Sequence, residues 1–182
     1  MTTCVALVRG INVGRAKRIA MTDLREAIES LGNANVRTLL NSGNVVFDAR
    51  RPSTEGLSRS IEESIRARFG FSAIVAVITA AELAAIIRAN PFPRAAAEPS
   101  KYLVAVSSSE VALAAARALV TQRWAPEAIA IDKRAAYLWC VNGIIESRVL
   151  KAFERAIEGA ATARNWTTML KLQAATAGQI DG

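Results

Sequence analysis

The chain has 182 residues, of which 52% are hydrophobic, 21% are charged and none is histidine, and its formal net charge at pH 7 is +7. This length suffices for one large or two small domains with cores of their own, and the hydrophobic fraction excludes a disordered chain. The absence of histidine excludes Ser-His-Asp and Cys-His catalytic pairs and most zinc sites, so any acid–base step would fall to a carboxylate, a lysine, a tyrosine or a thiol.

The positive charge is concentrated near the two ends of the chain. Residues 1–22 contain four basic and no acidic side chains, and residues 148–171 contain five basic and two acidic ones. Such local excesses favour anionic partners near these segments. The alternative is a basic surface whose charge serves only solvation.

Both cysteines, Cys4 and Cys140, lie inside apolar segments typical of strands. They are therefore expected to be small buried hydrophobic residues and not nucleophiles or disulfide partners. The N-terminal apolar run is too short for a signal peptide, and no stretch approaches the length of a membrane span. We therefore expect a cytoplasmic protein with no membrane association.

The first half of the chain predicts the order β-α-β-β-α-β followed by one more helix. Residues 3–9 predict the first strand, and the helix after it has Thr22 as its N-cap and Gly32 at its end. Two short β-prone segments, 36–40 and 45–47, flank a hairpin turn. The remaining elements predicted in this half are a helix at 54–69, a strand at 71–78 and a helix opened by the capping box Thr79–Glu82.

After the segment 91–100, which carries three prolines, the same order returns. Strands are predicted at 102–106, 128–131, 137–141 and 160–164. The capping box Ser107–Glu110 is expected to open a helix that ends near Gln122, Ser147 to cap a helix that ends at Gly159, and a last helix to span 167–175.

The predicted fold class is therefore α+β, with two ferredoxin-like α/β plaits in tandem, each βαββαβ plus an extra helix. The predicted domains are 1–90 and 101–182, and residues 91–100 are the predicted linker between them.

Two polar, glycine-bearing turns are predicted at one edge of the first sheet. The first comprises Arg9, Gly10, Asn12 and Gly14, and the second comprises Ser42, Gly43 and Asn44. In a ferredoxin-like plait the carboxyl end of the first strand and the second-to-third hairpin lie at the same edge, and the first helix begins there. Guanidinium, amide, hydroxyl and backbone N–H donors without an obvious proton acceptor indicate recognition of phosphate or carboxylate.

The alternative for each turn is purely structural. Residues 42–44 would then be only a hairpin turn, and Gly10 and Gly14 would only ease the exit from the strand. The segment from Gly10 to Lys17 lacks the spacing of a P-loop. No metal site is predicted, and the nearest proton acceptors, Asp23 and Lys17, give no specific support for catalysis. Whether the protein is an enzyme is left open.

Residues Arg164, Asn165 and Trp166 form a second polar motif, next to the last predicted helix. The structural interpretation is that Trp166 anchors this helix in the core, with Asn165 or Thr167 as its N-cap. The functional alternative is an anion held by Arg164 and the helix N-terminus, with the indole as a stacking surface.

Four motifs, taken together and in order, resemble the bacterial "domain of unknown function 1697" family. They are Leu7–Gly14, Asn41–Phe47, Asn90–Phe92 and Arg164–Trp166. The resemblance spans the whole chain and implies two ferredoxin-like halves, but no reaction or ligand. The family's motif positions carry over as Arg9, Gly10, Asn12, Gly14, Ser42, Gly43, Asn44, Arg164, Asn165 and Trp166. This sequence departs from the usual pattern at Arg15, where another glycine is usual, and at Ala163, where threonine is common.

These residues favour a binding protein for an anionic small molecule that carries a phosphate or carboxylate group. The alternatives are binding of nucleic-acid backbone, an enzyme that acts on a phosphorylated substrate without histidine chemistry, or a scaffold for a protein partner. A sheet that reads RNA carries aromatic residues on its central strands, where the third predicted strand offers only Phe47. The sequence identifies neither a cofactor nor an oligomeric state.

Overall fold

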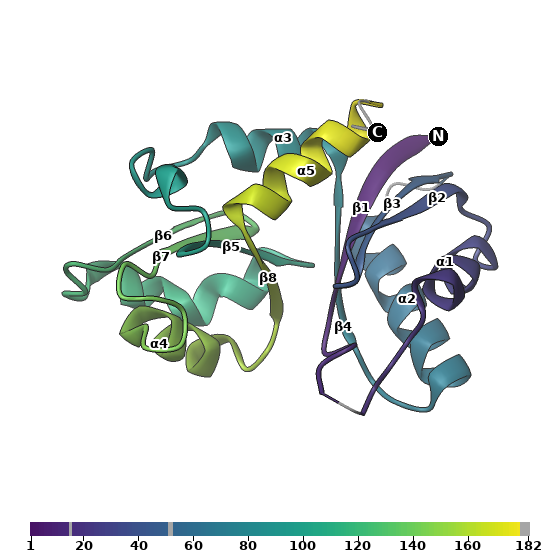
Figure 1. The fold of residues 1–182 in the computed structure, drawn as a ribbon, viewed down its shortest axis with the longest axis horizontal. Helices are drawn as coiled ribbons and strands as arrows, with labels where there is room; N and C mark the ends of the chain where they lie inside the picture. The colour runs from purple at the N-terminus through teal and green to yellow at the C-terminus, as the bar shows by residue number, and fades with distance from the viewer. Residues whose placement is uncertain (15, 51–52, 179–182) are drawn as a thin grey trace. The chain divides into compact units, whose positions relative to one another are not determined.

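A computed structural model of the chain describes residues 1–14, 16–50 and 53–178. Figure 1 shows its elements in two similar series. The strands are β1 (Thr2–Arg9), β2 (Ala34–Leu39), β3 (Asn44–Ala49), β4 (Ile74–Thr79), β5 (Tyr102–Ser107), β6 (Ala128–Asp132), β7 (Ala135–Trp139) and β8 (Ala161–Asn165). The α-helices are α1 (Met21–Glu29), α2 (Thr54–Phe69), α3 (Ala80–Arg88), α4 (Arg148–Ile157) and α5 (Trp166–Thr176), and the 3₁₀ helices are η1 (Ala95–Ala97) and η2 (Val111–Thr121).

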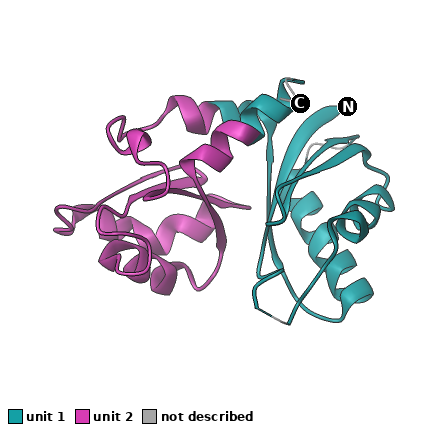
Figure 2. Cartoon of the chain, viewed as in Figure 1, with its two compact units in different colours: residues 1–84, 172–182 teal, residues 85–171 magenta. Residues whose placement is uncertain are grey.

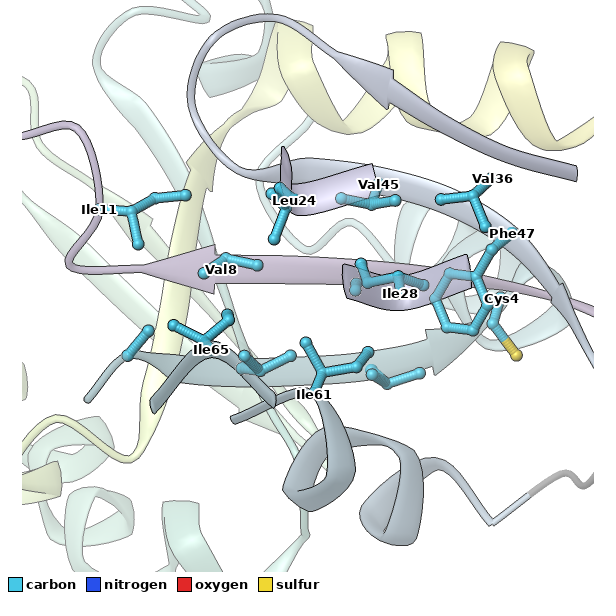
Figure 3. Packing of buried hydrophobic residues seen from close by; sticks show 14 of the residues in the cluster. Cys4, Val8, Ile11, Leu24, Ile28, Val36, Val45, Phe47, Ile61 and Ile65 are labelled. Carbon is cyan, nitrogen blue, oxygen red and sulfur yellow. The ribbon is translucent and has the colours of Figure 1, made fainter. Parts of the chain in front are cut away.

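The strands of the first half form one antiparallel sheet in the order β2-β3-β1-β4. β3 lies between β1 and β2 and is antiparallel to both, so β1 and β2 run in the same direction. Helices α1 and α2 cover one face of this sheet (Figure 1). The core on that face joins alternate residues of β1 with helix residues four positions apart (Figure 3): Cys4, Ala6, Val8, Leu24, Ile28, Ile61 and Ile65.

The second half repeats this arrangement in a sheet of order β6-β7-β5-β8. Its covering elements on one face are η2 and α4. The core between them and the sheet includes Leu103, Ala105, Leu113, Ala116, Leu138, Val149 and Phe153. The predicted fold class, α+β with two ferredoxin-like plaits that each carry one extra helix, is confirmed.

The chain forms two compact units whose limits fall inside helices (Figure 2). One unit comprises residues 1–84 together with the chain from residue 172 onward, and the other comprises residues 85–171. In the first unit, Arg37 of β2 donates from Nη2 to the carbonyl oxygen of Ala175 at 3.2 Å. In the second, the hydroxyl of Tyr137 on β7 donates to the carbonyl oxygen of Ile86 at 2.7 Å. The first hydrogen bond holds the C-terminal part of α5 against the first sheet, and the second holds the C-terminal part of α3 against the second sheet. The predicted domains 1–90 and 101–182, with a linker at 91–100, stay a prediction.

Local sequence signals set most helix ends where they were predicted. The capping box at α3 is formed, since Glu82 N donates to Thr79 Oγ1 at 3.1 Å and Thr79 N donates to Glu82 Oε2 at 2.7 Å. Ser147 caps α4 by accepting from Leu150 N at 3.1 Å. Gly70 ends α2 in the left-handed region, with φ +76°.

The predicted N-cap of the first helix is wrong. Helix α1 begins at Met21, its N-cap position is Ala20, and no side chain caps it, so Thr22 lies inside the first turn. The start of α1 is instead positioned by the preceding loop, where the side chain of Asn12 bonds to both the N–H and the carbonyl oxygen of Ile19. That contact fixes where the chain enters the helix and makes a hydroxyl cap unnecessary for positioning it.

The helix predicted between Ser107 and Gln122 is also different in the structure. The capping box does not form. The Ser107 hydroxyl instead accepts from Ser109 N at 3.3 Å and donates to the carbonyl oxygen of Ala160 at 3.0 Å, and Ser109 Oγ accepts from Ala112 N at 3.3 Å. The segment that follows is the 3₁₀ helix η2. Its buried residues Leu113, Ala116 and Leu119 are three positions apart, which is the repeat of a 3₁₀ helix, so burial on one face selects this form over the α-helix that the alanine-rich composition favours.

The two cysteines are buried and free, as predicted. Burial, with a smaller effect of the Glu82 and Asp48 carboxylates, raises the pKa of Cys4 to about 11. Burial likewise raises the pKa of Cys140. Neither thiol is therefore suited to act as a nucleophile near neutral pH.

Candidate functional site

The two polar turns of the first unit lie side by side at one edge of its sheet. Leu7 of β1 is paired with Asn44 of β3, and one step beyond this pair Val8 N donates to the carbonyl oxygen of Gly43 at 2.8 Å. The turn that follows β1 and the hairpin that joins β2 to β3 are therefore adjacent. This juxtaposition, on which the predicted site depends, is confirmed.

Gly43 allows the two turns to approach this closely. A Cβ atom at this position would lie 2.9 Å from Val8 O and 3.1 Å from Ile11 Cδ1, and φ is +73°. Ile11 is buried and packs back onto the core beyond the end of β1, beside Val8 (Figure 3). Glycine is thus required at this position both by its backbone conformation and by the space available.

Asn12 clamps the loop after β1. Its Oδ1 accepts from Ile19 N at 2.9 Å and its Nδ2 donates to Ile19 O at 3.0 Å, while its own N–H donates to Lys17 O at 2.9 Å. The residue has φ +56°, a conformation that asparagine tolerates better than most side chains. Because Ile19 is two residues before α1, this clamp holds the N-terminal end of α1 beside the turn.

The hairpin is shaped from inside by Asn44. This side chain is fully buried, and its Nδ2 donates to Leu39 O at 3.1 Å and to Ser42 Oγ at 2.8 Å. Ser42 itself is exposed. Asn44 therefore holds the turn together, and Ser42 is the exposed residue of the turn at residues 42–44.

Arg9 is the last residue of β1 and is half-buried. It is paired with Ile74 of β4, and its odd position places it on the face of the sheet opposite to that of Cys4, Ala6 and Val8, which pack under α1 and α2. Gly10 and Gly14 have φ +82° and +66° with open space where a Cβ would lie, so they serve the loop's conformation and not a close contact. The edge thus brings together backbone N–H groups and the positive end of α1, with Arg9 leaving β1 on the opposite face of the sheet.

The sequence profile of the family described as "Protein of unknown function (DUF1697)" matches residues 1–137. The chain belongs to this family. The resemblance noted from the sequence motifs is thereby confirmed over residues 1–137, and the edge formed by residues 9–14 and 42–44 lies within this matched part.

A solved structure of a relative supports the fold of this family member. It is the conserved bacterial protein SP0830 from Streptococcus pneumoniae, which is 18% identical to this chain with a TM-score of 0.72, and the match covers 96% of this chain and 98% of that one. At this identity the likeness establishes the fold alone. None of the curated proteins matches the chain in sequence. Within the part of the chain that the structure describes, no helix is long and apolar enough to cross a membrane.

The motif Arg164–Trp166 lies outside the matched residues and belongs to the second unit. Asn165 Oδ1 accepts from Thr168 N at 2.9 Å at the start of α5, and Trp166 is buried with its ring stacked on Tyr102 at 5.2 Å. These contacts confirm the anchoring role predicted for Trp166, with Asn165 as the capping side chain. Arg164 donates to Ala163 O at 2.8 Å, and burial lowers its pKa to about 10.

Tyr102 joins two family motifs that the sequence left unconnected. Besides stacking on Trp166, it donates from its hydroxyl to Asn90 Oδ1 at 2.6 Å and meets the edge of Phe92 at 6.3 Å between ring centroids. The motifs Asn90–Phe92 and Arg164–Trp166 are thus parts of one aromatic cluster. Sequence reasoning missed Tyr102 and the role of Ile19. The only available signal for Ile19 was an apolar residue directly after a basic segment.

Proposed function

We propose that this family member binds a small molecule bearing a phosphate or carboxylate group at the edge of the first sheet, with Arg9, the backbone of residues 10–14 and the turn at residues 42–44 as the recognition elements. The observation that carries the proposal is the direct contact between the two turns, from Val8 N to Gly43 O at 2.8 Å. It brings donors from segments about 30 residues apart to one place, which neither turn would achieve alone.

The chemistry of this edge suits an anion. A guanidinium offers planar, bidentate hydrogen bonding to a carboxylate or phosphate, and glycine-rich turns allow backbone N–H groups to approach it closely. Helix α1 carries no side-chain cap, so the positive end of its dipole is not covered by a capping side chain. The Asn12 clamp keeps that helix end in position and supports a site that is formed before the ligand arrives.

Nucleic-acid binding by this sheet is the weaker candidate. Phe47, the aromatic residue on the central strands β1 and β3, is fully buried on the side covered by α1 and α2. It therefore offers no stacking platform for a base. Catalysis on the bound anion would need a proton acceptor, and the nearest candidates, Asp23 and Lys17, are exposed side chains that the structure places in no hydrogen-bonded network.

The proposal is tested by calorimetric titration with inorganic phosphate, a nucleoside monophosphate and a dicarboxylate. We expect at least one of them to bind the wild type and to bind Arg9→Ala about 10- to 100-fold more weakly, the range for loss of a charge-assisted hydrogen bond. Arg59→Ala is the matched control, because Arg59 is an exposed arginine of the same unit on α2. Equal loss in both variants would reduce the effect to net charge, and binding that survives Arg9→Ala would contradict the proposal.

A further inference from the structure

We propose that the second unit carries a separate ligand site, in the pocket between the segment Pro91–Glu98 and Trp139 of β7, and that this site takes a planar aromatic molecule bearing a negatively charged group. The cavity has a volume of about 520 Å³, which lies in the range of small-molecule pockets. All the residues that line it belong to the unit 85–171. It is therefore built without any residue of the anion-binding edge.

The wall formed by residues 91–98 is held in place by a connected set of contacts. Asn90 Oδ1 accepts two hydrogen bonds, from Phe92 N at 2.9 Å and from the Tyr102 hydroxyl at 2.6 Å. Ala95 N donates to Phe92 O at 3.0 Å, which closes the turn at the start of η1. Pro91 and Pro93 fix two further φ angles. The wall is thus rigid before any ligand arrives, which reduces the entropic cost of binding.

The opposite wall is an indole on a central strand. Trp139 pairs with Tyr102 across β5 and β7, so both side chains lie on the face of the sheet away from η2 and α4. Tyr102 and Tyr137 on this face are fully buried, whereas Trp139 is half-buried and lines the pocket. Its partner on the edge strand β6 is the small residue Ala128. The indole therefore offers a planar surface beside an opening, which suits stacking of an aromatic ring.

The charged groups of the pocket favour an anion. Arg94 and Glu98 both line it. The carboxylate of Glu98 is occupied by Lys101, whose Nζ lies 2.7 Å from Oε2, so its charge is compensated. Arg94 is exposed. A ring stacked between Phe92, the prolines and Trp139 would therefore meet a surplus of positive charge from Arg94, and a carboxylate or phosphate on that ring would be complementary to it.

The test uses 2-naphthoate as the probe, followed through the three indole N–H signals in a two-dimensional NMR titration and by calorimetry. We expect the signal of Trp139, assigned with Trp139→Leu, to shift with saturation, and the signal of Trp124, whose Nε1 donates to Leu119 O at 2.7 Å, to stay in place. The uncharged analogue 2-naphthylmethanol should bind about tenfold more weakly, and cyclohexanecarboxylate, which has no planar ring, should bind more weakly still.

Arg94→Ala tests whether the site requires a negative charge on the ligand, and it removes an exposed side chain that is not part of the core. It should remove the preference for 2-naphthoate over 2-naphthylmethanol, and Arg117→Ala, an exposed arginine of η2 in the same unit, should keep it. Inorganic phosphate should not displace the probe from Trp139, which separates this site from the edge at Arg9. A Trp139 signal that does not respond to 2-naphthoate, a preference unchanged in Arg94→Ala, or tighter binding of 2-naphthylmethylammonium would each overturn the proposal.

Discussion

The two units contain the same contact at the same place in the sheet, with different consequences. In the first, Val8 N donates to Gly43 O at 2.8 Å, and in the second, Ser107 N donates to Arg134 O at 2.9 Å. The registers of β1 with β3 and of β5 with β7 make Val8 the counterpart of Ser107 and Gly43 the counterpart of Arg134. The hairpin thus carries a glycine in one unit and an arginine in the other.

In the second unit the edge is closed by its own side chains. Arg134 Nε donates to Ser107 O at 3.0 Å, and the Ser107 hydroxyl donates to Ala160 O. The chain then continues almost at once into η2. In the first unit Gly43 adds no side chain, and a loop clamped by Asn12 separates β1 from α1. One scaffold therefore supports two kinds of edge. In the first unit two turns pack closely together at Gly43, and in the second the Arg134 side chain bonds back to Ser107.

The opposite ends of the central strands differ as well. Thr3 and Asp48 are paired across β1 and β3, and Thr3 Oγ1 donates to Asp48 Oδ1 at 2.8 Å. The equivalent pair in the second unit is Tyr102 and Trp139. A polar, hydrogen-bonded pair in one sheet thus corresponds to the aromatic pair beside the proposed pocket in the other. The candidate sites are local substitutions on a repeated fold and are not properties of the fold itself.

The largest effect is expected at the glycine that allows the two turns of the first unit to pack together. Gly43→Ala should lower the free energy of unfolding by about 2–4 kcal/mol, because it combines a positive φ with a Cβ placed against Val8 O. Urea unfolding measures it. Gly14→Ala, with φ +66° and open space around the added Cβ, should cost only about 1 kcal/mol. Equal costs for the two variants would mean that the close approach of the turns is not what requires glycine.

The clamp in the loop is expected to contribute somewhat less. Asn12→Ala should lower stability by about 2 kcal/mol through loss of both hydrogen bonds to Ile19. Asn12→Asp keeps the acceptor for Ile19 N but removes the donor to Ile19 O, so about half of the loss is expected. The same unfolding experiment compares them. If Asn12→Ala were no less stable than Asn12→Asp, the clamp would not hold the loop.

The closed edge offers the reciprocal test. Arg134→Ala should lower stability by about 1 kcal/mol through loss of its hydrogen bond to Ser107 O, and should leave phosphate affinity unchanged. Arg134→Lys retains the positive charge but lacks the Nε donor, and should be about as destabilised as Arg134→Ala. If phosphate bound more weakly to either variant, the anion site would lie at the second unit's edge, and the proposed site at the first unit's edge would be contradicted.

The smallest effect concerns pH and the polar pair. Hydrogen bonds from Asn35 and then Thr3 lower the pKa of Asp48 below its ordinary value. The ionised carboxylate therefore stabilises the folded state above about pH 4, and this contribution is lost as the pH falls through the lowered pKa. Unfolding measured from about pH 5 down to about pH 3 should show a shallower loss of stability in Asp48→Asn than in the wild type. Identical slopes would contradict this role.

The order of elements could be predicted because hydrophobic periodicity and caps are local signals. Gly70, Ser147 and the capping box at Thr79 act within a few residues of sequence. The 3₁₀ form of η2 could not be predicted in this way, since it depends on burial of Leu113, Ala116 and Leu119 against the second sheet. The adjacency of the two turns followed from the topology of the plait once the fold class was assigned.

The roles of single side chains in the turns at residues 9–14 and 42–44 were harder to predict from the sequence. Asn12 and Asn44 were predicted as possible ligand donors, yet the structure uses Asn12 to hold Ile19 and Asn44 to hold Leu39 and Ser42. An amide can bond to the backbone or to a ligand, and composition does not distinguish the two uses. The need for glycine at residue 43 has two causes, and only the turn conformation is visible in the sequence. The contact with Ile11 requires the folded chain.

Under the proposed function, an anion binds at the first unit's edge and not at the second unit's. Backbone amide NMR during a titration with inorganic phosphate tests it most directly, because each unit reports through its own residues. Saturating shifts are expected at Gly10, Asn12 and Gly43, and none at Ser107, Ser109 and Arg134. Shifts at both edges, or only at the second, would contradict it.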